Sequence, residues 1–361
     1  MSSTRQHRRP AALAPFAVLA LLALVAAGCR GGGGSTSDDA TAPAVGTPTG
    51  PGDRPVQFEG AGKVKLFGTF SMPATAAGGN VPGVLILPTA GAGARNGVNG
   101  QTGVADPFGR DLSEAFTDAG LATYRYDQRG TGESRVEPDV RLTVDDLVAD
   151  ASAALDLLAQ RRETTGRDLS VVAYDQGGLI ALRRAAADDR VKRLVLVSTP
   201  GRSLADVRAA QLQARYGPES AEALRSVVAG LLATRTVPAL DELRTELRPL
   251  FPAEEAGFLA DLYGMDPAAE AARVRAQTMI VAPADPAPYD PQRLAAAIPG
   301  AQVVNSVGNG ATLLISGEAP EDRSDPSSAN HEHGAGPPVA VTQRDTAAIE
   351  QMTRFVAPST R

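Results

Sequence analysis

The stretch that decides the fold runs from Leu169 to Leu182 and reads LSVVAYDQGGLIAL. Its first half is apolar and rich in valine, as in a strand buried on both faces of a sheet. The apolar run stops before Asp175, two glycines follow at Gly177 and Gly178, and an apolar pattern of helical period then begins. The stretch therefore predicts a strand, a sharp turn at Asp175 and a helix.

Other apolar runs predict further strands and helices along the chain. Strands are expected at residues 56–59, 64–72, 84–87, 122–127, 191–198, 278–282 and 301–306, with the first two antiparallel and 301–306 as the last strand. Helices are expected from Phe108 to Gly120, after Thr143, and from Asp345 to Val356. Strands that alternate with helices indicate an α/β fold with a mainly parallel sheet and helices on both faces.

Length, charge and cysteine content narrow the class of protein. The chain has 361 residues, of which 43% are hydrophobic, and a net charge of −6. This is enough for one large domain with appendages. No basic block lies outside the N-terminus, so nucleic-acid binding has no electrostatic support and is not expected. The single cysteine, Cys29, excludes an internal disulfide.

Residues 1–29 are expected to be a targeting segment rather than part of the folded domain. Arg5, Arg8 and Arg9 precede an uncharged stretch that ends VAAGC at Cys29. Small residues before a lone cysteine resemble a bacterial lipoprotein signal peptide, in which the cysteine is lipidated and becomes the mature N-terminus. The alternative is an uncleaved transmembrane anchor of about 18 residues. Either arrangement predicts a domain held at the extracytoplasmic face of the cell membrane.

Composition divides the rest of the chain. Residues 30–54 are rich in Gly, Pro and Ser and predict a flexible linker, and residues 55–357 predict the folded domain. Within this domain, residues 203–275 are helical in pattern, rich in Ala, Leu and Arg, and longer than a plain crossover. They predict a cap over the carboxyl ends of the strands, where open α/β sheets place their ligands. Residues 316–338 are polar and predict a loop.

Several motifs, in order along the chain, resemble one family, the α/β-hydrolases. Ala173, Asp175 and Gly177 occupy the three marked positions of the family's G-x-S-x-G turn, with aspartate in place of serine. Four further stretches resemble segments of the serine-aminopeptidase-like and lysophospholipase-like branch: AGAGARNG at 90–97, YDQRGTGES at 126–134, LVLVSTPGR at 194–202 and LAAAIPGA at 294–301. The resemblance covers most of the domain and implies the α/β-hydrolase fold.

The resemblance also implies where a catalytic triad would lie. The family uses a serine nucleophile, an acid after the seventh strand and a histidine after the eighth. Here the serine position is Asp175, the acid position is Asp285, and the histidine position is Ala311. Two of the three triad positions are therefore changed, so membership of a hydrolase family does not by itself predict hydrolysis.

The residues around the turn have expected roles of their own. The backbone N–H of Gln176, with one from Thr89 or Ala90, is expected to form an anion-binding pocket, which would survive a loss of catalysis. Arg129 is expected to be structural and to pair with a local carboxylate or with the backbone, and Tyr174 is expected to pack at the strand end.

Asp175 has two interpretations. The related haloalkane dehalogenases and epoxide hydrolases use an aspartate in this turn, because an ionised carboxylate attacks carbon without a base. Release of the resulting ester needs an activated water, for which His331 or Asp285 would be the base. The alternative is that His331 and His333 lie in an exposed polar loop, and that Asp285 is a turn residue or the remnant of a lost triad. Two histidines without a third ligand do not predict a metal site, and no cofactor is expected.

Three functions follow from these alternatives. The first is a tethered, degenerate hydrolase that keeps a pocket for a small-molecule ligand or acyl-type substrate under its cap. The second is an active hydrolase of esters, epoxides or halides with Asp175 as nucleophile. The third is a cell-surface interaction protein with the cap as its partner face. In each of them the membrane is contacted through a lipid anchor at Cys29.

Overall fold

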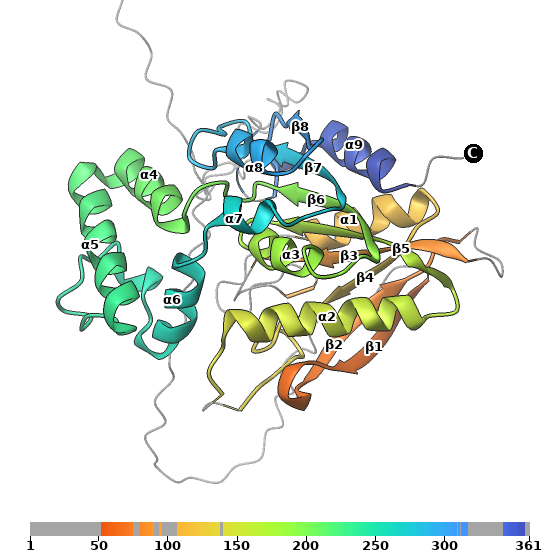
Figure 1. The fold of residues 1–361 in the computed structure, drawn as a ribbon, viewed down its shortest axis with the longest axis horizontal. Coiled ribbons are helices and arrows are strands. Elements are labelled where there is room, and N and C mark those ends of the chain that lie inside the picture. Colours follow the sequence, from red (N-terminus) through yellow and green to blue (C-terminus); the bar gives the residue numbers. More distant parts are fainter. Residues whose placement is uncertain are drawn as a thin grey trace, which may run out of the picture.

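The protein, studied as a computed structural model, contains a central sheet of eight strands with helices on both faces (Figure 1). The structure describes residues 52–74, 80–89, 94–95, 107–137, 140–308, 310, 312–316 and 342–357. The strands of the sheet are β1 (Asp53–Glu59), β2 (Lys65–Ser71), β3 (Val81–Leu87), β4 (Ala122–Tyr126), β5 (Thr164–Tyr174), β6 (Val191–Val197), β7 (Gln277–Ala282) and β8 (Gln302–Asn305).

The order of the strands in the sheet is β1-β2-β4-β3-β5-β6-β7-β8. β1 is antiparallel to β2, and β2 is antiparallel to β4. All other neighbours in this sheet, from β4-β3 to β7-β8, pair in parallel. The expected α/β fold with a mainly parallel sheet is therefore confirmed.

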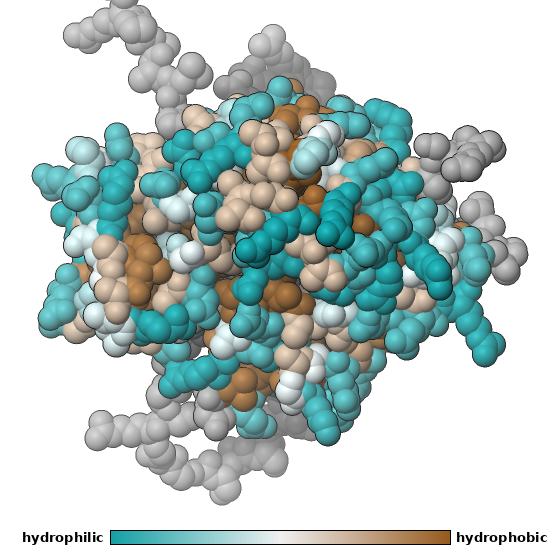
Figure 2. Space-filling view, viewed as in Figure 1, coloured by the Kyte–Doolittle hydropathy of each residue, from teal (hydrophilic) through white to brown (hydrophobic). Residues whose placement is uncertain are grey.

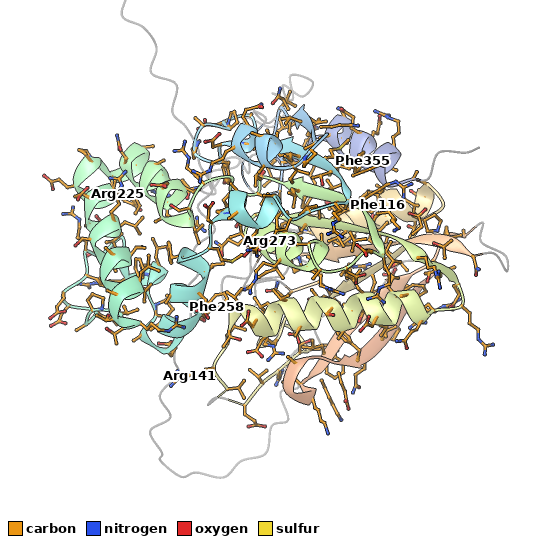
Figure 3. All side chains as sticks on the ribbon, viewed as in Figure 1. Phe116, Arg141, Arg225, Phe258, Arg273 and Phe355 are labelled. Carbon is orange, nitrogen blue, oxygen red and sulfur yellow. The ribbon has the colours of Figure 1, made fainter. Side chains whose placement is uncertain are left out.

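Side chains of the central strands alternate between two apolar layers, as the pleat requires. Val84 and Ile86 of β3 face one layer, which α1 (Phe108–Asp118) and α9 (Thr346–Val356) cover. Leu85 and Leu87 face the other layer, which α2 (Val144–Gln160), α3 (Gly177–Ala185) and α8 (Pro291–Ala297) cover. Figure 3 shows Phe116 of α1 beside Phe355 of α9, where these two helices meet. Both faces of the sheet are thus buried, which explains the continuous apolar runs of its strands.

Between β6 and β7 the chain forms the helices α4 (Leu204–Tyr216), α5 (Pro218–Thr234), α6 (Ala256–Tyr263) and α7 (Pro267–Ala271). The first three stand beyond the sheet, at the left of Figure 1. α4 packs along α5. Leu212 of α4, Leu224 of α5 and Phe258 of α6 are part of the main apolar core. Figure 2 shows apolar patches over these helices, and others near the middle and the top of the same face. We call residues 203–275 the cap.

The N-terminal and C-terminal parts differ from the sequence-based expectation in detail. β1 begins at Asp53, within the segment expected to be linker. Strand 301–306 is not the last one, because β9 (Leu314–Ser316) and β10 (Thr342–Arg344) follow it and pair antiparallel. Each has only three residues, too few to show a hydrophobic period. Within the part of the chain that the structure describes, no helix is long and apolar enough to span a bilayer.

Arg129 has the structural role expected of it. Its guanidinium donates to both carboxylate oxygens of Asp150, at 2.7 and 2.6 Å, and to the carbonyl of Ala61 at 3.1 Å. Asp150 lies on α2 and is fully buried. The guanidinium of Arg129 therefore balances the charge of the Asp150 carboxylate in the core. The pair fixes α2 against the loop that follows β4.

Asp345 joins the start of α9 to the end of β8. One carboxylate oxygen accepts from Ser306 Oγ at 2.7 Å and from the Val307 N–H at 2.9 Å, and the other caps α9 at the Ala348 N–H at 3.0 Å. Burial by itself would raise the pKa of Asp345, but the hydrogen bonds outweigh it and hold this pKa below its usual value.

Because the pKa of Asp345 is lower in the folded than in the unfolded protein, its contribution to stability is present above the unfolded value of about 3.9 and is lost as the pH falls through the folded value. We expect Asp345→Asn to lower the free energy of unfolding by about 1–3 kcal/mol at neutral pH, since the amide cannot accept at both positions. Urea unfolding at neutral and at acid pH measures the difference in free energy of unfolding between the parent protein and Asp345→Asn. We expect this difference to become smaller in acid. A difference that is constant over this range would contradict the account.

Candidate functional site

The turn at Asp175 has the sharp geometry that the sequence predicts. Asp175 has φ 52°, in the left-handed region that aspartate tolerates better than most residues. Its N–H donates to the carbonyl of Val197 at 2.9 Å, and its own carbonyl accepts from the Gly178 N–H at 3.0 Å. The chain therefore turns directly from β5 into α3. Asp175 is left at the carboxyl end of the sheet, beside the N-terminus of the helix.

The two glycines after Asp175 are required by close packing. A Cβ at Gly177 would lie 2.1 Å from the carbonyl oxygen of Pro88, in the chain that leaves β3. A Cβ at Gly178 would lie 2.0 Å from Thr199 Oγ1, in the chain that leaves β6. The start of α3 is thus wedged between two neighbouring strand ends, and any side chain there would push the turn out of position.

The carboxylate of Asp175 is held by the loop after β3. Thr89 Oγ1 donates to Asp175 Oδ2 at 2.9 Å, and Asp175 is 8% exposed. The next residue, Gln176, is almost fully buried, and its Oε1 has no hydrogen-bond partner among the described residues. The structure therefore brings Thr89 to the Asp175 carboxylate through its hydroxyl, while the anion-binding pocket of backbone N–H groups stays a prediction.

Ser198 brings the loop after β8 to the same end of the sheet. It directly follows β6, is buried, and has φ 48°. Its N–H donates to the carbonyl of Val281 at 2.9 Å and its Oγ to the carbonyl of Gly310 at 2.8 Å. Strand ends β6 and β7 and the segment at Gly310 are therefore tied together near the Asp175 turn.

Tyr289 is a buried phenol whose pKa is shifted by charged groups of the site. Burial, followed by the negative charge of Asp175, raises the pKa of its phenol to about 12, while Arg208 of the cap acts in the opposite direction. The negative charge of Asp285 makes a smaller contribution to the same rise in pKa. Gln211 Nε2 donates to the phenol oxygen at 3.4 Å, a long hydrogen bond. The charges of Asp175, Asp285 and Arg208 therefore all act on the pKa of the Tyr289 phenol.

The predicted site residues are only partly covered by the structure. Asp285 is exposed and lies in a bend after β7. Its negative charge, like that of Asp175, raises the pKa of Tyr289. Tyr174 packs edge-on against Phe108, with the two ring centroids 5.2 Å apart, as expected of a residue that packs at a strand end. The predicted residues Cys29, Ala90, Ala311, His331 and His333 lie outside the described residues. No group of three potential metal ligands occurs among those that are described.

Two site residues were not foreseen from the sequence, Tyr289 and Arg208. Tyr289 lies in a proline-rich turn without any periodic signal. Arg208 did have a signal, because it is spaced four residues from Leu204 and from Leu212 on the buried face of α4. An arginine in the apolar stripe of a helix is unusual and indicates a partner or a function.

Comparison with known proteins identifies the class. A family model described as the alpha/beta hydrolase fold matches residues 83–263, and the chain belongs to this family. No curated protein matches the chain. Among solved structures, DcsB in complex with its substrate analogue has 16% identity and a TM-score of 0.53, over 84% of this chain and 98% of that chain. A hypothetical protein from Pseudomonas aeruginosa has 16% identity and a TM-score of 0.51, over 72% and 87%. At such identities the likeness shows the fold alone.

The packing at the turn can be tested with Gly177→Ala. We expect this variant to lose about 1–3 kcal/mol of folding free energy or more, because the new methyl group meets backbone oxygen that cannot move aside. Gly230→Ala is the matched control: Gly230 lies on α5 and a Cβ there meets nothing within 4 Å, so this change should be neutral or slightly stabilising. Urea unfolding measures both, and similar values for the two variants would refute the packing argument.

Proposed function

We propose that this α/β-hydrolase-fold protein binds a small-molecule ligand at the Asp175 site and does not carry out serine-type hydrolysis. The observation that carries the proposal is a carboxylate, oriented by Thr89, at the position of the nucleophilic serine. The ligand is held at the carboxyl ends of the strands, under the cap, where open α/β sheets place their ligands. Turnover would require groups that the described site does not supply.

The chemical argument concerns the proton and the attacking atom. In serine-type hydrolysis a hydroxyl attacks the carbonyl carbon while a histidine takes its proton. An ionised carboxylate has no proton to give up, and its acyl product would need an activated water for release. The resemblance to the family puts Ala311, whose side chain cannot take a proton, at the histidine position. The scaffold of the site is kept while its proton chemistry is lost.

A second candidate, hydrolysis through an aspartate nucleophile, is favoured by the place of Asp175 at the N-terminus of α3, where a negative charge is stabilised. In this reaction one carboxylate oxygen forms a bond to the carbon of a halide or epoxide, and the halide or ring oxygen leaves with the electron pair. An ester remains on Asp175 until water attacks it. His331 or Asp285 would have to activate that water.

One set of measurements separates the two candidates. We expect the purified protein and Asp175→Ala to be equally inactive on a panel of short-chain esters, epoxides and alkyl halides, with no mass adduct on the peptide that contains Asp175. Asp175→Ser should also be inactive because Ala311 cannot accept the proton. Circular dichroism verifies that each variant is folded. Turnover or an adduct that Asp175→Ala abolishes would establish the aspartate nucleophile and refute the proposal.

The proposal includes a location. The sequence VAAGC before and at Cys29 supports a lipid anchor that holds the domain at the extracytoplasmic face of the membrane. When cells expressing the chain are fed radiolabelled palmitate, we expect label in the protein and its recovery with the membrane fraction. Cys29→Ala should lose both. Membrane recovery of this variant without label would instead indicate an uncleaved transmembrane segment.

A further inference from the structure

Arg208 is a buried arginine that has no counterion among the residues that the structure describes. It lies in the second turn of α4 and is 9% exposed. Its guanidinium donates from NH1 to the neutral Gln211 Oε1 at 3.0 Å. Among the residues that the structure describes, no carboxylate lies within 4.0 Å of its guanidinium. Gln211 also reaches Tyr289, so that Arg208, Gln211 and Tyr289 form a short chain from the cap to the site.

The other strongly buried arginines show what this environment normally demands. Arg95 is paired with Asp127, Arg125 with Asp53 at 3.0 Å, and Arg129 with Asp150 at 2.6 Å. Each of these guanidinium groups has its charge balanced within the fold. Removing a charge from water costs several kcal/mol per ion unless a partner compensates for it. At Arg208 the described part of the fold provides an amide oxygen and no carboxylate, so that within this part the positive charge remains to be balanced.

The position of Arg208 connects this charge to the Asp175 site. Arg208 and Asp175 act with opposite sign on the phenol of Tyr289, and Arg208 also acts on the buried Tyr263 of α6. Tyr289 in turn lies beside the turn that holds Asp175: the Gly201 N–H donates to the Tyr289 carbonyl at 2.7 Å, and Thr199, two residues before Gly201, packs against Gly178. The site therefore combines a positive side chain from α4 with a negative one from the turn after β5.

We propose that Arg208 binds an oxyanion, a carboxylate or a phosphate, carried by the ligand of this site. A planar guanidinium matches both groups in two parallel hydrogen bonds. The other end of the ligand carries a hydroxyl or an amine, which donates to Asp175. The inference rests on the proposed function, because it names the chemistry of the ligand that the Asp175 site holds.

The first test needs no ligand. If the charge of Arg208 is uncompensated, Arg208→Met should raise the midpoint of thermal unfolding of the ligand-free protein by about 2–4 °C, because a hydrophobe of similar length replaces a buried ion. Arg225→Met is the control: Arg225 is exposed on α5, where Figure 3 labels it, and it pairs with Glu222 at 3.4 Å. A lowered midpoint for Arg208→Met alone would show that Arg208 is a structural residue and would overturn the proposal.

The second test measures binding by calorimetry with lactate, phosphoethanolamine and the uncharged methyl lactate. We expect the parent protein to bind at least one anionic probe about tenfold more tightly than methyl lactate, and Arg208→Met to lose about tenfold or more of this affinity while Arg225→Met keeps it. The preferred probe distinguishes carboxylate from phosphate. Equal affinity for charged and uncharged probes, or unchanged binding by Arg208→Met, would overturn the inference. Neither test involves turnover, so failure of the proposed function would be seen separately.

Discussion

The contact between the start of α3 and the end of β3 is the constraint on which the site depends. Gly177 lies so close to the Pro88 carbonyl that no side chain fits there. The residue after Pro88, Thr89, donates a hydrogen bond to the Asp175 carboxylate. The same close approach therefore sets the direction of the turn and brings its hydrogen-bond partner. Since β3 and β5 are adjacent parallel strands, their ends are already aligned by the register of the sheet.

Charge organises the rest of the site. The interior pairs most of its buried arginines with aspartates, and those pairs hold helices and loops to the sheet. At the carboxyl end of the sheet the pairing stops: Arg208 on the cap and Asp175 on the turn act on the same phenol without a direct bond between them in the structure. Separated opposite charges in a partly buried space favour a ligand that has complementary groups at its two ends.

Local patterns predicted the sheet and the turn, because strand burial, helix period and glycine placement are all visible within a dozen residues. The region from Leu169 to Leu182 folds as its sequence indicates. The same patterns could not place Tyr289 or Arg208, since Gln211 joins them only after the segment that follows β7 and the cap helices have packed together. β9 and β10 were missed because three residues per strand carry no period, and their pairing is long-range.

The glycine motif and the chemistry of the turn are separable. Gly177 and Gly178 are demanded by the carbonyl of Pro88 and the side chain of Thr199, whatever residue precedes them. The left-handed backbone at position 175 is one that aspartate adopts at low cost, so the turn remains stable without serine. Gly177 and Gly178 lie within residues 83–263, which the model of the alpha/beta hydrolase fold matches. The side chain that the turn presents is a separate matter, and here it is the carboxylate of Asp175, which the hydroxyl of Thr89 holds.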